Sequence, residues 1–244
     1  RLSVPGWRGI QFLMAAEQSM AALGIKPGLC AIIGSGGKTS LLLRLAGELP
    51  GRVLVCTSTR ILPPPLLLYT GAEEAALASL LQVHGVVCVG TAAEQGKLAA
   101  PVLPFAALCR LADYVLVEAD GSKHLPLKAH LAHEPVIPPE AGQCILVVGA
   151  TGFDRPIGEA AHRAARFCAL AGRQPEDPAR PCDIAAVLRQ EGLTRTVVVN
   201  QVETPEQLAQ AKALASCLPG WAVYAAAVQR GVCQRLDLPQ GGAM

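Results

Sequence analysis

Six residues that read Gly-Ser-Gly-Gly-Lys-Thr stand between an apolar run and a helix-like run. Glycines let several backbone N–H groups turn toward one anion, and the start of a following helix adds the positive end of its dipole. The lysine can reach the β- and γ-phosphates of a nucleotide, and the threonine hydroxyl can bind Mg²⁺. We therefore predict a phosphate-binding loop for ATP or GTP with Mg²⁺. Its residues are Gly34, Ser35, Gly36, Gly37, Lys38 and Thr39.

This loop is shorter than the common pattern G-x-x-x-x-G-K-[ST]. The position of the first glycine in that pattern is occupied here by Ile32. Shortened loops of the type G-x-x-G-K-T occur in ATP-dependent Mur-type ligases, which this segment resembles. The alternative is a glycine-rich turn with an incidental lysine, but a strand before the loop and a helix after it favour phosphate binding.

A second candidate is the apolar segment Tyr-Val-Leu-Val, which ends in the two carboxylates Glu118 and Asp120. A carboxylate at a strand end beside the phosphate loop can hold Mg²⁺ through water or polarise an attacking water. We predict that both acids are catalytic and that Glu118 also serves the metal, while the division of roles stays open. The alternative is a turn, since Asp-Gly is a common turn pair. Thr57, at the end of an earlier strand, is equally a candidate for Mg²⁺ and for a turn cap.

A later apolar strand runs into Asn200, Gln201 and Glu203. This order resembles the N-K-x-D motif for guanine, in which the acid accepts two N–H bonds from the base and the asparagine braces the loop. Here glutamine replaces the lysine and glutamate replaces the aspartate. We predict base binding by Asn200 and Glu203, with a polar strand end as the alternative. The choice between adenine and guanine stays open.

The stretch 119–140 contains prolines and histidines and has no clear periodicity, which predicts a long functional loop. Polar residues in this loop and soon after it are candidates for a substrate or switch site. They are Lys128, His133, Glu134, His162 and Arg163. A zinc site at His130 and His133 is the weaker interpretation, because a third ligand and the H-E-x-x-H order are missing. A solvated loop and a helix start explain His162 and Arg163 equally well.

Short β-branched runs alternate with helix-like runs, which predicts a mostly parallel sheet with helices on both faces. The expected strands are 29–33, 53–56, 86–89, 114–117, 145–148, 196–199 and 222–226, and the expected helices are 12–23, 38–49, 73–81, 106–111, 160–171, 184–190 and 206–218. Ligands of such sheets bind beyond the carboxyl ends of the strands, where the candidate residues stand. We expect an α/β fold of the P-loop nucleoside-triphosphate-binding type, with 1–244 as a single domain.

The composition narrows the classes of partner. Hydrophobic residues make up 51% of the chain, but no run approaches the roughly twenty apolar residues of a membrane span. The net charge is +2, aromatic residues are 4%, and no basic cluster interleaves with aromatics, so we expect no nucleic-acid or membrane partner. The first residues show no signal pattern. Nine scattered cysteines without a C-x-x-C pair suggest reduced, mostly buried thiols in a cytoplasmic protein, rather than a thiol that carries sulfur or selenium.

Taken together, these motifs resemble the YqeC-type family. The residues that carry the resemblance are Gly34-Ser-Gly-Gly-Lys-Thr, Thr57-Ser-Thr, Glu118-Ala-Asp-Gly, Leu-Pro126-Leu-Lys128-Ala, His133-Glu-Pro-Val-Ile-Pro138, His162-Arg163 and Asn200-Gln-Val-Glu203. The resemblance implies an α/β P-loop protein that is an accessory factor of selenium-dependent molybdenum hydroxylases. The chain departs from the family at Ser58, where threonine is usual, and at Glu203, where aspartate is expected.

From the resemblance we expect a nucleoside-triphosphate-binding accessory protein. Its hydrolysis of ATP or GTP would serve maturation or cofactor insertion of a selenium-dependent molybdenum hydroxylase, and that enzyme or its maturation proteins would be the partners. Two alternatives stay open: an ATP-dependent ligase or kinase acting on a small molecule, and a binding module that senses nucleotide without hydrolysis. Composition and spacing alone indicate nucleotide binding and say nothing about selenium, the acceptor or the oligomeric state.

Overall fold

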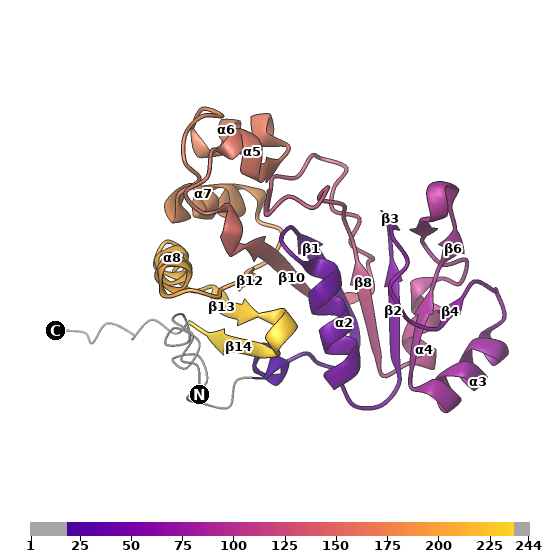
Figure 1. The fold of residues 1–244 in the computed structure, drawn as a ribbon. Coiled ribbons are helices and arrows are strands. Elements are labelled where there is room, and N and C mark those ends of the chain that lie inside the picture. Colours follow the sequence, from indigo (N-terminus) through magenta and orange to yellow (C-terminus); the bar gives the residue numbers. More distant parts are fainter. Residues whose placement is uncertain (1–18, 237–244) are drawn as a thin grey trace, which may run out of the picture.

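The predicted phosphate loop follows the central strand of a nine-stranded sheet (Figure 1). The computed structural model describes residues 19–236, in which the strand order is β14-β13-β12-β10-β1-β8-β2-β5-β4. The strands are β1 (Gly28–Gly34), β2 (Val53–Thr57), β4 (Leu68–Tyr69), β5 (Val86–Val89), β8 (Tyr114–Glu118), β10 (Ala141–Gly149), β12 (Thr196–Asn200), β13 (Ala222–Ala227) and β14 (Val232–Arg235). Neighbours are parallel except β13 and β14. The predicted α/β class with a mostly parallel sheet is confirmed.

Helices cover both faces of this sheet, as expected. Successive side chains of a strand point to opposite faces, so Ile32 packs in one apolar cluster with α2 (Lys38–Glu48), whereas Ile33 packs in another with α7 (Pro181–Glu191) and α8 (Pro205–Ser216). A third cluster joins the sheet to α3 (Glu74–His84) and α4 (Phe105–Leu111). Burial on both faces explains why the strands read as continuous apolar runs.

Two small sheets follow the carboxyl ends of the large-sheet strands. One has the order β3-β7-β6, and the other pairs β9 with β11 in parallel. Their strands are β3 (Arg60–Ile61), β6 (Thr91–Ala92), β7 (Leu98–Ala99), β9 (Leu127–Lys128) and β11 (Ala161–His162). The remaining elements are α5 (Ile157–Ala160), α6 (Ala164–Ala171) and the 3-10 helices η1 (Met20–Leu23), η2 (Glu94–Gly96), η3 (Ala150–Gly152) and η4 (Val228–Arg230).

The segment 119–140, expected to be a long loop, is tied to the phosphate loop and to neighbouring strands. The hydroxyl of Ser35 donates to the carbonyl of Leu125. The N–H of Gly149, at the end of β10, donates to the carbonyl of Pro126 at 2.8 Å. Strand β9 then joins the segment to β11. These contacts hold the segment against the residues predicted to bind phosphate.

Several expectations about the elements need correction. The helix expected at 160–171 is interrupted, because β11 pairs with β9 and α6 begins only after Arg163, whose φ is 66°. The carbonyl of His162 accepts from the N–H of Ala129 at 3.1 Å, a tertiary partner that helical periodicity does not reveal. Strand β14 and the two-residue strands were not expected, since two residues cannot show alternation. Of the helix expected at 12–23, residues 12–18 lie outside the described residues, and Met20–Leu23 form a 3-10 helix.

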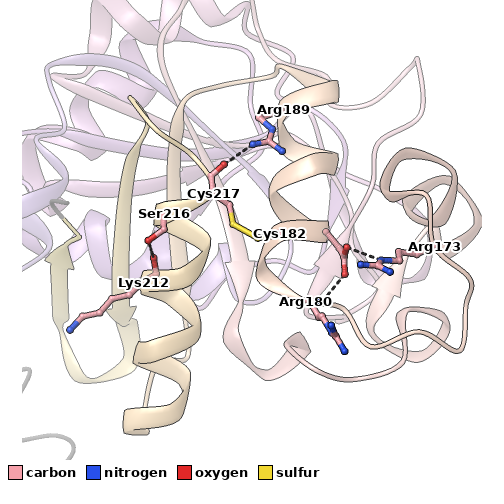
Figure 2. Close-up of a disulfide and its surroundings, with 8 residues drawn as sticks. Arg173, Arg180, Cys182, Arg189, Lys212, Ser216 and Cys217 are labelled. Atoms are coloured by element: carbon pink, nitrogen blue, oxygen red, sulfur yellow. Dashed lines mark hydrogen bonds and ion pairs between the residues drawn. A yellow bond between two sulfur atoms is a disulfide. The ribbon is translucent and has the colours of Figure 1, made fainter. Parts of the chain in front are cut away.

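A disulfide joins Cys182, in α7, to Cys217, just after α8 (Figure 2). The two Cα atoms are 5.6 Å apart, and Arg189 of α7 donates a hydrogen bond to the carbonyl of Cys217 at 2.7 Å. The expectation that all cysteines are reduced is therefore wrong for this pair. Their separation of 35 residues in the chain carries no signal of contact. The other cysteines are free, and most of them are buried.

The high apolar content of the chain fills the three clusters between sheet and helices. Phe167, Met20 and Ile32 are among the largest side chains that are fully buried there. Within residues 19–236 no helix is both long enough and apolar enough to span a bilayer.

Candidate nucleotide-binding site

The turn from β1 into α2 depends on glycines in the left-handed region. Gly36 has a φ of 85° and Gly37 a φ of 114°, values that residues with a side chain rarely adopt. A Cβ on Gly36 would lie 2.3 Å from the backbone of Gly149, and one on Gly37 would lie 2.4 Å from the side-chain nitrogen of Asn200. Both conformation and close packing therefore require glycine in this loop. Helix α2 begins at Lys38 with no side-chain cap, which leaves N–H groups of its first turn available to an anion.

Lys38 is fixed by its own loop and by two acids at the end of β8. Its Nζ donates to the carbonyl of Gly34 at 2.8 Å and lies 3.1 Å from Asp120 Oδ1 and 3.7 Å from Glu118 Oε1. The hydroxyl of Ser122 accepts from the same Nζ at 3.2 Å. Only 3% of the side chain is exposed. The positive charge is thus held at the loop, where an incoming phosphate would need it.

Thr39 and Glu118 form an oxygen pair at the start of α2. The threonine hydroxyl donates to Glu118 Oε2 at 2.8 Å. Burial raises the pKa of Glu118, and Lys38 and Thr39 offset only part of that shift. Mg²⁺ prefers oxygen ligands and is usually held by one or two carboxylates together with substrate phosphates. The residues present fit such a site, and within residues 19–236 no group of three or more His, Cys, Asp or Glu side chains could hold a metal by itself.

Asp120 is buried behind this pair and does not line the cleft. Its Oδ2 accepts from the N–H of Gly34 at 2.9 Å and lies 3.0 Å from Lys128 Nζ and 2.8 Å from His130 Nε2. Burial by itself raises the pKa of Asp120, but the bond with His130 and the charges of Lys38 and Lys128 outweigh it and lower the pKa to about 2. The aspartate is therefore a charged anchor that joins the phosphate loop to the segment 119–140.

His130 bridges Asp120 to a residue that the sequence did not single out, Glu191. His130 Nδ1 lies 2.8 Å from Glu191 Oε2, and the His130 N–H donates to Glu191 Oε1 at 2.5 Å. Burial lowers the pKa of His130, but the two carboxylates raise it more, so the net shift is upward. Glu191 is the last residue of α7, 61 residues after His130 in the sequence, and no motif surrounds it. This series of contacts from Glu191 through His130 to Asp120 therefore connects α7 to the phosphate loop. Helix α7 packs on the face of the sheet that α2 does not cover.

The predicted substrate or switch residues are only partly brought together. Lys128 Nζ lies 2.8 Å from Glu134 Oε2, and an Arg163 nitrogen lies 2.9 Å from Glu134 Oε1. These cations outweigh the effect of burial and lower the pKa of Glu134. His162 lies beside them, and burial together with Lys128 and Arg163 lowers its pKa. His133 is different, because its side chain is 73% exposed and does not line the cleft.

A cleft of about 720 Å³ opens over the phosphate loop. Its volume is within the range of small-molecule and cofactor sites. The charged side chains in its wall are mostly cationic. The cations are Lys38, Arg60, Lys97, Lys123 and Arg163, and the acids are Glu118 and Glu134. Such a surface favours a polyanionic ligand such as a triphosphate.

Other predicted site residues also lie outside the wall of this cleft, namely Gly34, Ser35, Lys128, Thr57, Asn200 and Glu203. Thr57 is fully buried, and its hydroxyl donates to the carbonyl of Glu118 at 2.8 Å, which ties β2 to β8. Asn200 donates to the carbonyl of Gly36 at 2.9 Å and accepts from the N–H of Val228 at 3.2 Å, so it braces the phosphate loop. Glu203 is exposed. Its neighbour Gln201 does line the cleft and accepts from the hydroxyl of Thr151 at 3.0 Å.

The free cysteines are poor candidates for nucleophiles. Burial raises the pKa of Cys30, Cys88, Cys144 and Cys233 to about 12. The thiolate is the reactive form of cysteine, and at neutral pH these side chains are thiols. None of the cysteines lines the cleft over the phosphate loop.

Comparison with known proteins places this site within a described family. The family described as "YqeC protein" matches residues 30–165, which include the phosphate loop, both acids and the segment 119–140. The chain is also 32% identical over 178 residues to a protein of Escherichia coli (strain K12) described as "Uncharacterized protein YqeC". That match covers 67% of this chain and 68% of the relative. No solved structure matches the chain.

Proposed function

The chain belongs to the YqeC family, and from this premise we propose that it binds a nucleoside triphosphate with Mg²⁺ and hydrolyses it. One observation carries the proposal. The ammonium of Lys38 and the hydroxyl of Thr39, which are neighbours in the loop, both contact Glu118, at 3.7 Å and 2.8 Å. A cation, a hydroxyl and a carboxylate thus converge beside a glycine loop, as phosphoryl chemistry requires.

Each residue has a distinct task in this proposal. Lys38 neutralises the terminal phosphates, and the N–H groups at the start of α2 add further donors. Thr39 and Glu118 would hold Mg²⁺, which would draw charge from the phosphates when bound. Glu118 also faces the cleft, so its carboxylate can orient a water molecule there. Asp120, through its contacts with Gly34 and Lys38, positions the loop rather than the water.

The base is proposed to lie toward the ends of β10 and β12, where Thr151 and Gln201 line the cleft. Asn200 supports this side indirectly, because it braces the loop through Gly36. Glu203 lies outside the cleft wall, so we propose ATP or GTP without a preference. The family resemblance extends the proposal to maturation or cofactor insertion of a selenium-dependent molybdenum hydroxylase, with that enzyme or its maturation proteins as partner in the cytoplasm.

The test is a thermal-shift series with ATP, GTP and their diphosphates in the presence of Mg²⁺, followed by phosphate release. A ligand at about a hundred times its Kd stabilises the native state by about 2.7 kcal/mol, which corresponds to a rise in Tm of about 5–10 °C. Lys38→Ala should weaken triphosphate binding by about one to two decades, because one charge-assisted bond is lost. Lys212→Ala, an exposed lysine of α8, is the matched control. Equal affinities of the parent and Lys38→Ala would remove the phosphate-loop assignment.

A second candidate function, an ATP-dependent ligase or kinase, is favoured by the extent of the cleft. Its wall continues beyond the loop to Arg60, Lys97 and the prolines 63–65, more residues than a triphosphate loop alone requires. Phosphate release without any acceptor supports the hydrolase, whereas release that depends on an added small molecule supports the second candidate. Binding without turnover under both conditions supports a nucleotide-sensing module.

A further inference from the structure

The part of the cleft formed by β3 and the residues that follow it is not used by the proposed nucleotide site. We infer that this part binds a second small molecule, one that carries a phosphate or carboxylate group and an apolar portion. The inference rests on the proposed function for the orientation of the nucleotide. It concerns Arg60, Lys97 and the stretch from Ile61 to Pro65, all of which line the cleft.

The position of Glu118 decides which side of the loop is left for a second ligand. A metal in a phosphoryl-transfer site neutralises the terminal phosphates, so Mg²⁺ held by Thr39 and Glu118 would place these phosphates beside the two residues. Glu118 ends β8, which lies between β1 and β2 in the sheet. The nucleoside then extends the other way, toward the ends of β10 and β12. The side of β2 and of the small sheet β3-β7-β6 remains free, next to the place where the terminal phosphate would lie.

Two cations on that side have no partner among residues 19–236. Arg60 lies in β3, and Lys97 immediately precedes β7, which pairs with β3. Within residues 19–236 neither side chain makes an ion pair or a hydrogen bond, in contrast to Lys38 and Arg163, which both contact carboxylates. A guanidinium group can bind a phosphate or carboxylate through two parallel hydrogen bonds, and an ammonium adds a point charge. This pair is therefore suited to one anionic group.

An apolar surface continues from the same strand. Leu62 is 60% exposed although it lines a cleft, and prolines 63–65 follow it. Large apolar side chains left exposed inside a cleft favour a ligand that covers them. Proline has no N–H and a restricted backbone, so this wall offers a rigid apolar surface with few donors. The ligand should therefore carry a hydrocarbon or ring portion next to its anionic group.

The experiment uses phenyl phosphate as the probe and inorganic phosphate as its polar comparison. Each is titrated calorimetrically into the full chain saturated with Mg²⁺ and a non-hydrolysable ATP analogue. Phenyl phosphate should bind more tightly than inorganic phosphate. The double variant Arg60→Ala/Lys97→Ala should weaken its binding at least tenfold, and Leu62→Ser should reduce its advantage over inorganic phosphate. Arg195→Ala/Lys212→Ala, which removes two exposed charges outside the cleft, should change neither.

A parallel titration without nucleotide on Lys38→Ala separates this inference from the proposed function. Binding that survives Lys38→Ala but is lost in Arg60→Ala/Lys97→Ala supports the second site, even if nucleotide binding itself fails. The reverse pattern means that phenyl phosphate occupies the phosphate loop, and it overturns the inference. Absence of measurable binding to any of the proteins also overturns it. A cooperative unfolding transition without ligand shows that each variant is folded. Lys38→Ala should unfold at a lower Tm than the parent, because it removes a buried partner of Asp120.

Discussion

Glu118 and Asp120 are two residues apart, yet their surroundings shift their pKa values in opposite directions. Glu118 lines the cleft, and burial raises its pKa. Asp120 is 1% exposed and is surrounded by Lys38, Lys128 and His130, so its pKa falls to about 2. A carboxylate with that many fixed partners organises a site, whereas one at the cleft wall can meet the metal or water. We therefore propose different roles for the two acids, because their neighbours differ.

The first prediction follows from this difference. Asp120→Asn keeps the size of the side chain but leaves the buried side chains of Lys38, Lys128 and His130 without their common anion. Removing one partner of a buried ion pair costs about 3–5 kcal/mol, so the free energy of unfolding in urea should fall by about 3 kcal/mol or more. Glu118→Gln should cost less, because Lys38 keeps Asp120 as a partner and burial already disfavours the charged form of Glu118. It should abolish most Mg²⁺-dependent phosphate release. Stability that falls more in Glu118→Gln than in Asp120→Asn would contradict the assignment of roles.

At the scale of elements, the phosphate loop is set by backbone conformation. Gly36→Ala places a Cβ about where Gly149 already packs and adds a left-handed residue, which costs about 1–2 kcal/mol before the clash is counted. We expect a lower Tm and weaker triphosphate binding. Gly47→Ala is the matched control, because this exposed glycine lies within α2 and a Cβ there meets nothing within 4 Å. It should raise stability by about 0.5–1 kcal/mol, and equal behaviour of the two variants would count against a strained loop.

The disulfide also acts at the scale of elements, because it joins two helices. It closes a loop of 35 residues between α7 and the end of α8, and loss of such a cross-link costs about 2–4 kcal/mol. Cys182→Ser, Cys217→Ser or reduction should lower the Tm, whereas Cys109→Ser, a free thiol, should have a smaller effect. Thiol titration of the denatured, non-reduced chain should find two fewer thiols than after reduction. An equal count before and after reduction would show that the bond does not form.

At the scale of the whole molecule, stability should depend on pH through His130. Its pKa is raised in the folded state above the usual value near 6.5, so its contribution to stability is complete below that value and is lost as pH rises through the folded-state pKa. Urea unfolding between pH 6 and 8.5 should show decreasing stability. His130→Gln should be less stable overall and should show a weaker dependence on pH, because the titrating group has been removed.

Other titrating groups also change the stability of the protein with pH. The pKa of His162 is lowered, so its contribution is lost as pH falls below 6.5, in the opposite sense. Buried thiols such as Cys30 ionise more easily in the unfolded chain, which reduces stability above about pH 9. The difference between the parent and His130→Gln cancels both effects. An identical pH dependence in the two proteins would show that Asp120 and Glu191 do not hold a charged histidine.

The sequence by itself determined the α/β class and most element positions, and it singled out the glycine loop for which we propose phosphate binding. Buried parallel strands are apolar, and a glycine-rich turn before a helix is typical of an anion-binding loop. Short stretches of sequence are therefore enough to predict these features. Tertiary structure alone decided the different surroundings of Glu118 and Asp120, the bracing by Asn200, the interruption at His162 and the pairing of Cys182 with Cys217. Glu191 has no motif around it, and it reaches His130 only because α7 packs beside the segment 119–140. Contacts between residues far apart in the chain depend on how layers pack, and that packing leaves no periodic trace in the sequence.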